Sequence, residues 1–280
     1  MKKSVFATKK ARRHVSFALK LFVGLIFISP VLLAFVFSFV PDEELYNLPT
    51  ISRIIESFTI DNYRWVFTNV PILRYITNSL VMCLIVIVMQ ILIAAITAYA
   101  FAYFDFKCKN LLFSLVLVAM MIPSQVTIIA NFLTVRNAGF VNTYLGLTLP
   151  SMVGCKSIFM LRQSYLTLPK DLREATLMDG CGDIRFLVQF AFPLSLPTVA
   201  SLAIMVFIDI YNAYLWPLLV SRDSSMFTVQ LGMAALVGGE LPTYGRMFAG
   251  AVLSIAVPIV AFIIGQDYLI KGMTKGAVKG

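Results

Sequence analysis

Histidine is almost absent from this chain, because the only one, His14, lies in the basic N-terminal segment. Histidine-based catalysis inside a membrane and most zinc chemistry are therefore excluded. Cys83, Cys108, Cys155 and Cys181 are scattered without a CxxC pair, so we interpret them as packing residues and expect no metal site. The phosphate-cradling loops GxxxxGKS/T and GxGxxG are also missing. We therefore expect no bound cofactor, no catalytic residue and no enzymatic activity of the chain itself.

Charged residues are also scarce, at 13% of the chain, whereas hydrophobic residues make up 59%. Soluble domains contain about 25% charged residues, and so few charges cannot cover the surface of a 280-residue soluble protein. The mean hydropathy of +0.86 points to lipid as the solvent. This composition excludes a disordered chain, a disulfide scaffold and a nucleic-acid module.

What the chain does contain is a series of apolar windows long enough to cross a bilayer, which takes roughly 20 helical residues. The windows are 21–40, 76–104, 111–135, 145–161, 194–220 and 247–266. Pro123-Ser124-Gln125 interrupts the third, and the fourth contains Lys156, which can snorkel to the inner membrane surface. We predict an all-α, polytopic membrane protein, 1–280, with one transmembrane domain of six helices.

The basic residues are distributed unequally between the two sides of the predicted membrane. Sixteen of the 23 Lys and Arg residues lie in or beside the N-terminal tail 1–20, the loop 162–193, the tail 267–280 and the loop before residue 111, and six lie on the opposite side. By the positive-inside rule, both termini are then cytoplasmic. The formal net charge of +9 reflects this orientation, and we expect no nucleic-acid partner.

The cytoplasmic loop between the fourth and fifth windows predicts a short, self-capped helix. Pro169 suits its first turn, Asp171 matches the positive end of its dipole, and Gly180 is placed for a left-handed cap. Asp183 is the predicted cap of a second helix that ends at Pro193. Two interpretations remain open: an amphipathic helix that lies on lipid headgroups, and a helix presented to a cytoplasmic partner.

This loop resembles the EAA loop of ABC importer permeases. The residues Glu174-Ala175-Thr176, Asp179-Gly180 and, nine residues later, Phe190-Ala191-Phe192-Pro193 stand where that family usually has Glu-Ala-Ala, Gly and Ile-x-Leu-Pro. Thr176, Phe190 and Phe192 depart from the family pattern but roughly keep its size or apolar character. Further stretches resemble the carbohydrate-type permeases that are similar to the second maltose permease subunit: Asn78-Ser79-Leu80, Gly139–Leu147, Leu161-Arg162-Gln163, Trp216-Pro217-Leu218 and Gly276–Gly280.

The resemblance implies the architecture of a type I ABC importer permease in a bacterial inner or cytoplasmic membrane. It implies four kinds of partner: a second permease subunit, two ATP-binding subunits that use ATP and Mg, an extracytoplasmic solute-binding protein and a carbohydrate substrate. The ATPase-coupling residues that it implies are Leu172, Glu174, Ala175, Leu177, Met178, Asp179 and Gly180. It also suggests that the tail 267–280 lies near the ATPase dimer interface, although a tail held by lipid headgroups is the alternative.

Polar residues inside the predicted spans are candidates for the substrate pathway. They are Asp209, Tyr211, Asn212, Tyr214, Ser124 and Gln125. Asp209 and Asn212 either line the pathway or bond neighbouring helices, and the break at Ser124 is either a gate or a kink. Functional alternatives are import of glycerol 3-phosphate or another polyol phosphate, a proton- or sodium-coupled carrier that uses Asp209, and a membrane-embedded enzyme.

Overall fold

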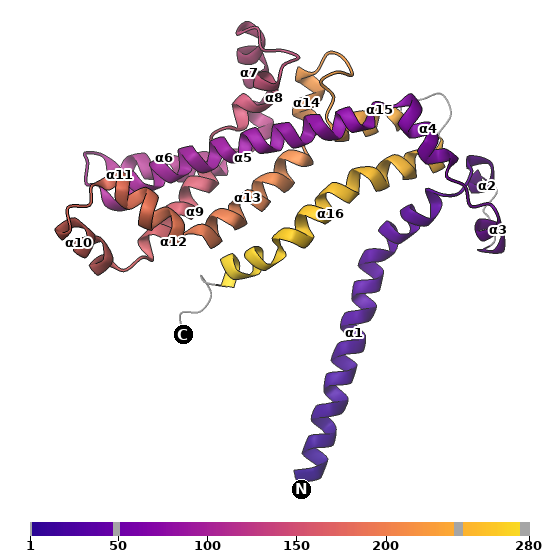
Figure 1. Cartoon of the computed structure of the whole chain (residues 1–280), viewed down its shortest axis with the longest axis horizontal. Helices are drawn as coiled ribbons and strands as arrows, with labels where there is room; N and C mark the ends of the chain where they lie inside the picture. The colour runs from indigo at the N-terminus through magenta and orange to yellow at the C-terminus, as the bar shows by residue number, and fades with distance from the viewer. Residues whose placement is uncertain (1, 47–50, 238–242, 275–280) are drawn as a thin grey trace. The chain divides into compact units, whose positions relative to one another are not determined.

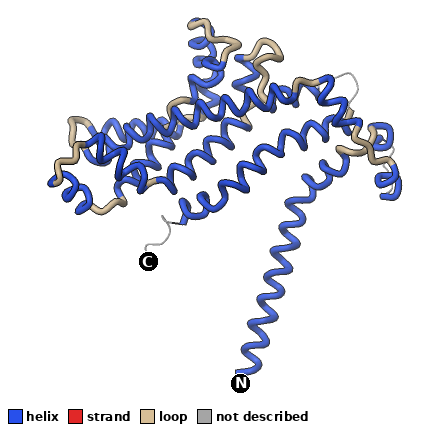
Figure 2. The backbone as a smooth tube through the Cα atoms, viewed as in Figure 1, coloured by secondary structure: helices blue, strands red, loops and turns tan. Residues whose placement is uncertain are grey.

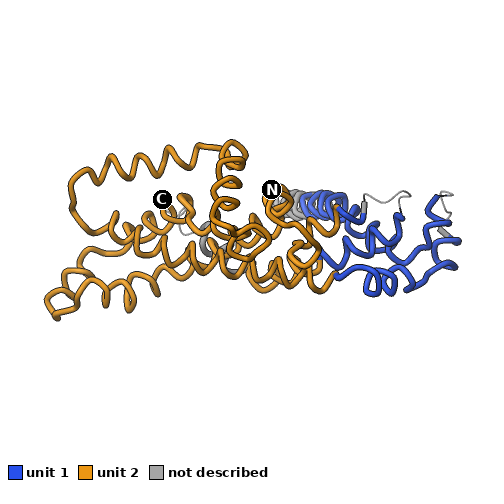
Figure 3. The backbone as a smooth tube through the Cα atoms, turned by 90° about the horizontal axis from the view of Figure 1, so that it is seen from above, with its two compact units in different colours: residues 1–71, 235–255 blue, residues 72–234, 256–280 orange. Residues whose placement is uncertain are grey.

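The computed structural model describes residues 2–46, 51–237 and 243–274 of the chain. Within these ranges all regular structure is helical and no strand occurs, as Figure 2 shows. The chain divides into two compact units, drawn in two colours in Figure 3. One unit consists of residues 1–71 and 235–255, and the other of residues 72–234 and 256–280.

The first unit contains the four N-terminal helices and the beginning of the last helix (Figure 1). They are α1 (Lys2–Phe37), α2 (Asp42–Tyr46), α3 (Ile51–Glu56), α4 (Asp61–Asn69) and α16 (Tyr244–Thr274), whose residues beyond 255 belong to the second unit. Asn62 in α4 donates hydrogen bonds to Ser38 O and Val40 O, which satisfies backbone carbonyls where α1 ends. The Asp42 carboxylate accepts the Gly245 N–H at 2.7 Å and so joins α2 to α16.

The second unit contains the remaining helices, which include several short or bent ones. They are α5 (Ile72–Tyr103), α6 (Lys109–Met121), α7 (Ser124–Asn137), α8 (Tyr144–Thr148), α9 (Cys155–Leu166), α10 (Lys170–Met178), α11 (Asp183–Phe186), α12 (Phe192–Leu194), α13 (Leu196–Tyr211), α14 (Leu215–Val220) and α15 (Val229–Val237), which reaches into the first unit. A 3-10 turn over Leu149–Ser151 precedes α9, and a π-helical segment over Leu187–Ala191 joins α11 to α12.

In the described part of the chain, three unbroken helical stretches are long and apolar enough to cross a membrane: Leu19–Phe37, Ile72–Tyr103 and Tyr244–Gln266. Three further stretches pass the same test only as bent pairs, α6 with α7 at 99°, α8 and its 3-10 turn with α9 at 50°, and α11–α12 with α13 at 74°. Six spans are therefore reached when each bent pair counts as one. The break predicted at Pro123 is confirmed, because α6 ends at Met121 and α7 begins at Ser124.

The core of the second unit forms where α5 packs against α9 and α13. Ala94, Ala95 and Ala98 on α5 are almost fully buried in this core, with Leu161 and Tyr165 of α9. Small side chains allow two helices to approach closely, and membrane helices depend on such packing because lipid provides no hydrophobic drive between them. The uninterrupted helix α5 is therefore the element on which the rest of this unit is built.

Candidate functional site

The loop between α9 and α11 carries α10, which ends in a left-handed cap. Gly180 has a φ of 74°, a conformation in which a residue without Cβ carries little strain. The Cys181 N–H donates to Thr176 O at 2.9 Å, and the Gly180 N–H donates to Leu177 O at 3.0 Å. These are the two bonds of a Schellman motif, so the cap predicted at Gly180 is confirmed. The following helix α11 begins at Asp183 with Gly182 as its N-cap, one residue before the predicted cap.

One side of α10 packs on the core and the other is open. Thr176 is buried, and Leu172 is half-buried against the core cluster that contains Tyr165. The remaining residues expected to couple to an ATPase, Glu174, Ala175, Leu177, Met178, Asp179 and Gly180, are all exposed. Met178 is 84% exposed, which is unusual for a large apolar side chain outside a membrane span. Leu172 therefore supports the helix from behind, while the other six residues form the exposed surface.

Arg173 attaches this helix to the end of α5. Its Nη2 lies 3.0 Å from Asp183 Oδ1, and its Nη1 donates to Tyr103 O at 3.2 Å. Its guanidinium lies over the Tyr103 ring, with 4.6 Å between Cζ and the ring centroid. The Tyr99 hydroxyl donates to the same Asp183 oxygen at 2.9 Å. A planar group with five donors can make such contacts at once, and α10 is thereby held against the C-terminal end of α5.

The sequence did not predict this role of Arg173. The signal available in the sequence was a pair of tyrosines, Tyr99 and Tyr103, spaced four residues apart at the end of the second apolar window. Such a pair lies on one helix face and offers two rings and a hydroxyl to a neighbouring cation. The contact with Asp183 depends on the fold of the loop, so spacing alone does not predict it.

Most of the predicted pathway residues surround one cavity of about 690 Å³ in the second unit. Asp209, Asn212 and Tyr214 line it from α13 and the turn that follows, and Ser124 and Gln125 line it from the start of α7. Tyr211 lies apart from them, because its side chain is buried to 1% exposure and stacks on Phe207. The structure thus brings together five of the six residues.

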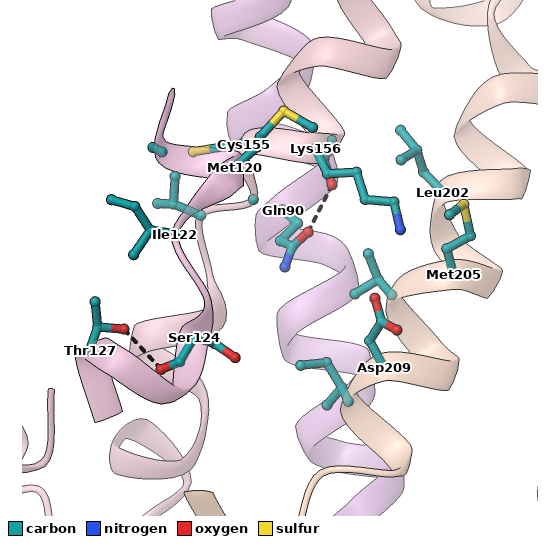
Figure 4. A pocket seen from close by; sticks show the side chains of 16 residues that line it. Gln90, Met120, Ile122, Ser124, Thr127, Cys155, Lys156, Leu202, Met205 and Asp209 are labelled. Atoms are coloured by element: carbon teal, nitrogen blue, oxygen red, sulfur yellow. Dashed lines mark hydrogen bonds between the residues drawn. The ribbon is translucent and has the colours of Figure 1, made fainter. Parts of the chain in front are cut away.

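A second cavity of about 540 Å³ shares Ser124 and Asp209 with the first. Lys156 at the start of α9 points into this cavity, toward α13, as Figure 4 shows. The expected snorkelling of Lys156 to the inner membrane surface stays a prediction. The helix break before Cys155 brings the first residues of α9 beside this cavity.

Gln90 of α5 stabilises that helix break from the side. Its Nε2 donates to Ser151 O at 2.7 Å, and its Oε1 accepts the Ser157 hydroxyl at 2.8 Å. The backbone carbonyl left over at the end of the 3-10 turn is thereby satisfied, which matters because an unpaired carbonyl at membrane depth is costly. A Cβ on Gly154 would collide with the Gln90 side chain, so glycine permits this close approach.

The segment after α14 is tied to the start of α5 by a network of asparagines. Asn78 donates to Ser225 O and Phe227 O, and Asn142 Nδ2 donates to Asp223 Oδ2 at 2.7 Å. The pKa of the Asp223 carboxyl lies below its ordinary value because hydrogen bonds stabilise the ionised form. The largest contributions come from the side chain and the backbone N–H of Ser225, followed by the side chain of Asn142. The Asn78 bonds hold Ser225 and Phe227 beside the start of α5.

Among the residues that the structure describes, no three His, Cys, Asp or Glu side chains gather as metal ligands. What the described residues define is a polytopic helical membrane protein with a self-capped, exposed loop helix and broken helices around polar cavities. The chain belongs to the family of binding-protein-dependent transport system inner membrane components, whose sequence profile matches residues 90–275. It is thus a multi-pass ABC transporter permease, as its resemblance to the EAA-loop family implied.

Individual relatives agree with this family. The arabinooligosaccharides transport system permease protein AraQ of Halalkalibacterium halodurans is 34% identical over 261 residues, which cover 92% of this chain and 94% of that protein. The sn-glycerol-3-phosphate transport system permease protein UgpE of Yersinia pestis is 30% identical over 262 residues, with coverage of 89% and 91%.

Solved structures share the fold. A chain from the crystal structure of a bacterial ABC transporter involved in the import of the acidic polysaccharide alginate superposes with a TM-score of 0.78. It is 18% identical, and the match covers 91% of this chain and 95% of that one. A chain of the alginate transporter in complex with its pentasaccharide-bound periplasmic protein gives a TM-score of 0.61 at 14% identity. The all-α permease fold is thereby confirmed.

Proposed function

We propose that this chain is one of two permease subunits of an ATP-driven importer that moves a sugar or oligosaccharide through the membrane. The AraQ relatives, whose names specify arabinooligosaccharides, support this substrate class. The chain would form half of the pathway, with the cavities around Asp209 on its inner face. A second permease subunit would supply the other half, and an extracytoplasmic solute-binding protein would deliver the solute.

The coupling to ATP would pass through α10. The observation that supports this most strongly is the exposed surface of Glu174, Leu177 and Met178 on a helix fixed from behind by Arg173. Ile184 and Val188, which follow in the same loop, are 81% and 62% exposed and extend the apolar surface. Such a surface fits a groove on an ATP-binding subunit, with Glu174 as a charged contact. Two such subunits would use ATP and Mg, and this chain would have no nucleotide site of its own.

The proposed coupling through α10 also implies which parts of the chain would face the cytoplasm. Both termini and the loop 162–193 would be cytoplasmic, because the basic residues gather there. The whole chain, 1–280, would act as one transmembrane domain with the spans given by the six apolar windows. The tail 267–280 would contribute near the ATPase interface, and its residues 275–280 lie outside the described part of the chain.

The coupling role is tested in the complete transporter with Glu174→Lys and Gly180→Pro. Reversal of the charge removes the proposed contact, and proline cannot adopt the positive φ of the cap. We expect normal membrane insertion but loss of binding-protein-stimulated ATP hydrolysis and of uptake. A matched variant, Glu56→Lys, changes the same residue type far from the loop in sequence and should transport normally. Unchanged uptake in both loop variants would contradict the coupling role.

Import of glycerol 3-phosphate or another polyol phosphate is the second candidate function. The UgpE relatives, which are 30% identical to this chain, favour it. The two functions differ in the solute that the binding protein delivers. Calorimetric titration of the purified binding protein with arabinotriose and with glycerol 3-phosphate would therefore separate them.

A further inference from the structure

Two opposite charges face the same cavity in the second unit. Lys156 reaches in from the start of α9 and Asp209 from the last turns of α13 (Figure 4). They are the only charged residues in the described lining of this cavity of about 540 Å³. No nitrogen–oxygen pair within 4.0 Å joins them in the described part of the chain, where four other ion pairs do meet that distance. Both charges therefore keep their hydrogen-bonding capacity for another group.

The other strong polar group in the lining is already engaged. Both polar ends of the Gln90 side chain are hydrogen-bonded, to Ser151 O and to the Ser157 hydroxyl. Lys156 and Asp209 are thus the charged groups able to contact a solute in this cavity. Charged side chains at membrane depth are costly and are retained where they face water, each other or a ligand. The cavity meets this condition, because helix breaks at Ile122 and Gly154 border it.

The charges of Lys156 and Asp209 are opposite and sum to zero, and this balance favours a solute without net charge. An ammonium group donates up to three hydrogen bonds, and a carboxylate accepts several from hydroxyl groups. A neutral polyol satisfies both ends, because each of its hydroxyls can donate and accept. A phosphate or uronate would be attracted by Lys156 but repelled by Asp209 across the same small space. The volume also lies within the range of about 300–1,000 Å³ that is usual for small-molecule sites.

We propose that Lys156 and Asp209 form a subsite for one uncharged, hydroxyl-rich unit of the transported solute. The inference rests on the proposed function and narrows it, because it selects a neutral carbohydrate over a polyol phosphate. The adjoining cavity, which shares Asp209, presents the aromatic rings of Tyr214 and Trp216. Sugar rings bury their apolar faces on such side chains, so a neighbouring unit of an oligosaccharide would lie there.

The test measures uptake and ATP hydrolysis by the complete transporter with its binding protein in proteoliposomes. The probes are radiolabelled arabinotriose, maltotriose and glycerol 3-phosphate, and the variants are Lys156→Met and Asp209→Asn. We expect wild type to import a neutral saccharide and each variant to import about tenfold less of it per ATP hydrolysed, as expected for one lost charged hydrogen bond. Lys107→Met and Asp105→Asn, which change the same residue types in an exposed loop, should stay within twofold of wild type.

Four outcomes would overturn the inference, and each is distinguishable from the others. Wild type that imports none of the three probes contradicts the proposed function itself. Wild type that imports a saccharide, with both variants unaffected, contradicts only the subsite. Import of glycerol 3-phosphate that increases in Asp209→Asn shows an anion site instead. Recovery of uptake when Lys156→Asp is combined with Asp209→Lys shows that the two residues serve only each other as an ion pair.

Discussion

Arg173 Nη2 and Asp183 Oδ1 lie 3.0 Å apart, so a salt bridge joins α10 to α11 across the Gly180 cap. The arginine side chain is 20% exposed and the aspartate 45%, which places the pair at the edge of the core. Together with the Tyr103 contacts, this bridge fixes the direction in which α10 presents its exposed residues. The proposed coupling role requires such support, because a movement at the surface of α10 would reach the membrane only if the base of the helix is rigid.

Replacement of Arg173 by methionine should therefore uncouple the loop without unfolding the subunit. The change removes the bridge and the bond to Tyr103 O, at a cost of about 1–2 kcal/mol for a partly exposed pair. We expect faster proteolysis between residues 167 and 186 and lower uptake, with a normal amount of subunit in the membrane. Arg173→Lys keeps the charge but not the two-pronged geometry, so an intermediate effect is expected. Protease resistance equal to that of wild type in Arg173→Met would contradict the anchoring role.

Gly180→Ala should loosen the end of α10 through backbone strain alone. No atom lies within 4 Å of a Cβ built at this position, but a φ of 74° costs an L-residue about 1–2 kcal/mol. Hydrogen exchange of the Cys181 N–H, which bonds Thr176 O, should become faster. Gly180→Asn is the matched control, because asparagine tolerates the left-handed region, and its exchange should stay close to wild type. Equal exchange in the alanine and asparagine variants would contradict this explanation.

Gly154→Ala should destabilise the helix break beside the cavity by steric contact. The new Cβ would meet the Gln90 side chain and lie 3.0 Å from Ser157 Oγ, and neither can move without losing a hydrogen bond. We expect a loss of about 1–3 kcal/mol, seen as a lower thermal midpoint in detergent. Gly24→Ala, in the interior of α1 and with no atom within 4 Å of the added carbon, should not lower the midpoint. A normal midpoint for Gly154→Ala would show that Gln90 has room to shift.

Acid should loosen the segment around Asp223. Its pKa in the folded protein lies below the ordinary value of 3.8, so the ionised form stabilises the fold above that value. This contribution is lost as the pH falls from 3.8 through the lowered pKa. Hydrogen exchange of the Ser225 N–H, which bonds Asp223 Oδ1, should accelerate over that range. Asp223→Asn carries no charge to titrate, so its exchange should show no such step, and a step of equal size there would contradict the assignment.

The sequence predicted best those features that depend on local chemistry. The Gly180 cap and the break before Ser124 follow from glycine and proline, which act on their own backbone. Each of these features needs only a short stretch of chain, so neighbouring residues are enough to specify it.

The features that the sequence did not predict depend on distant parts of the chain. The partners of Arg173 come from α5 and α11, which meet only after the core has packed. Lys156 faces the cavity because Gln90 holds a helix break open next to it. Tyr211 points away from Asp209 because two residues on a helix differ by about 200° in direction. Residues that are neighbours in a sequence motif can lie on different faces of a helix, whereas the residues that line a cavity from one helix lie on the same face.

The helix α5 contains neither proline nor glycine from Ile72 to Tyr103. Gln90, beside the cavity, and Tyr103, beside the loop helix, are thirteen residues apart on it, or about 20 Å at 1.5 Å per residue. Without a hinge between them, α5 is a stiff lever with the cavity near its middle and the joint to α10 at its C-terminal end. A push on the loop would therefore arrive at the cavity as a tilt of the whole lever, with no intermediate relay.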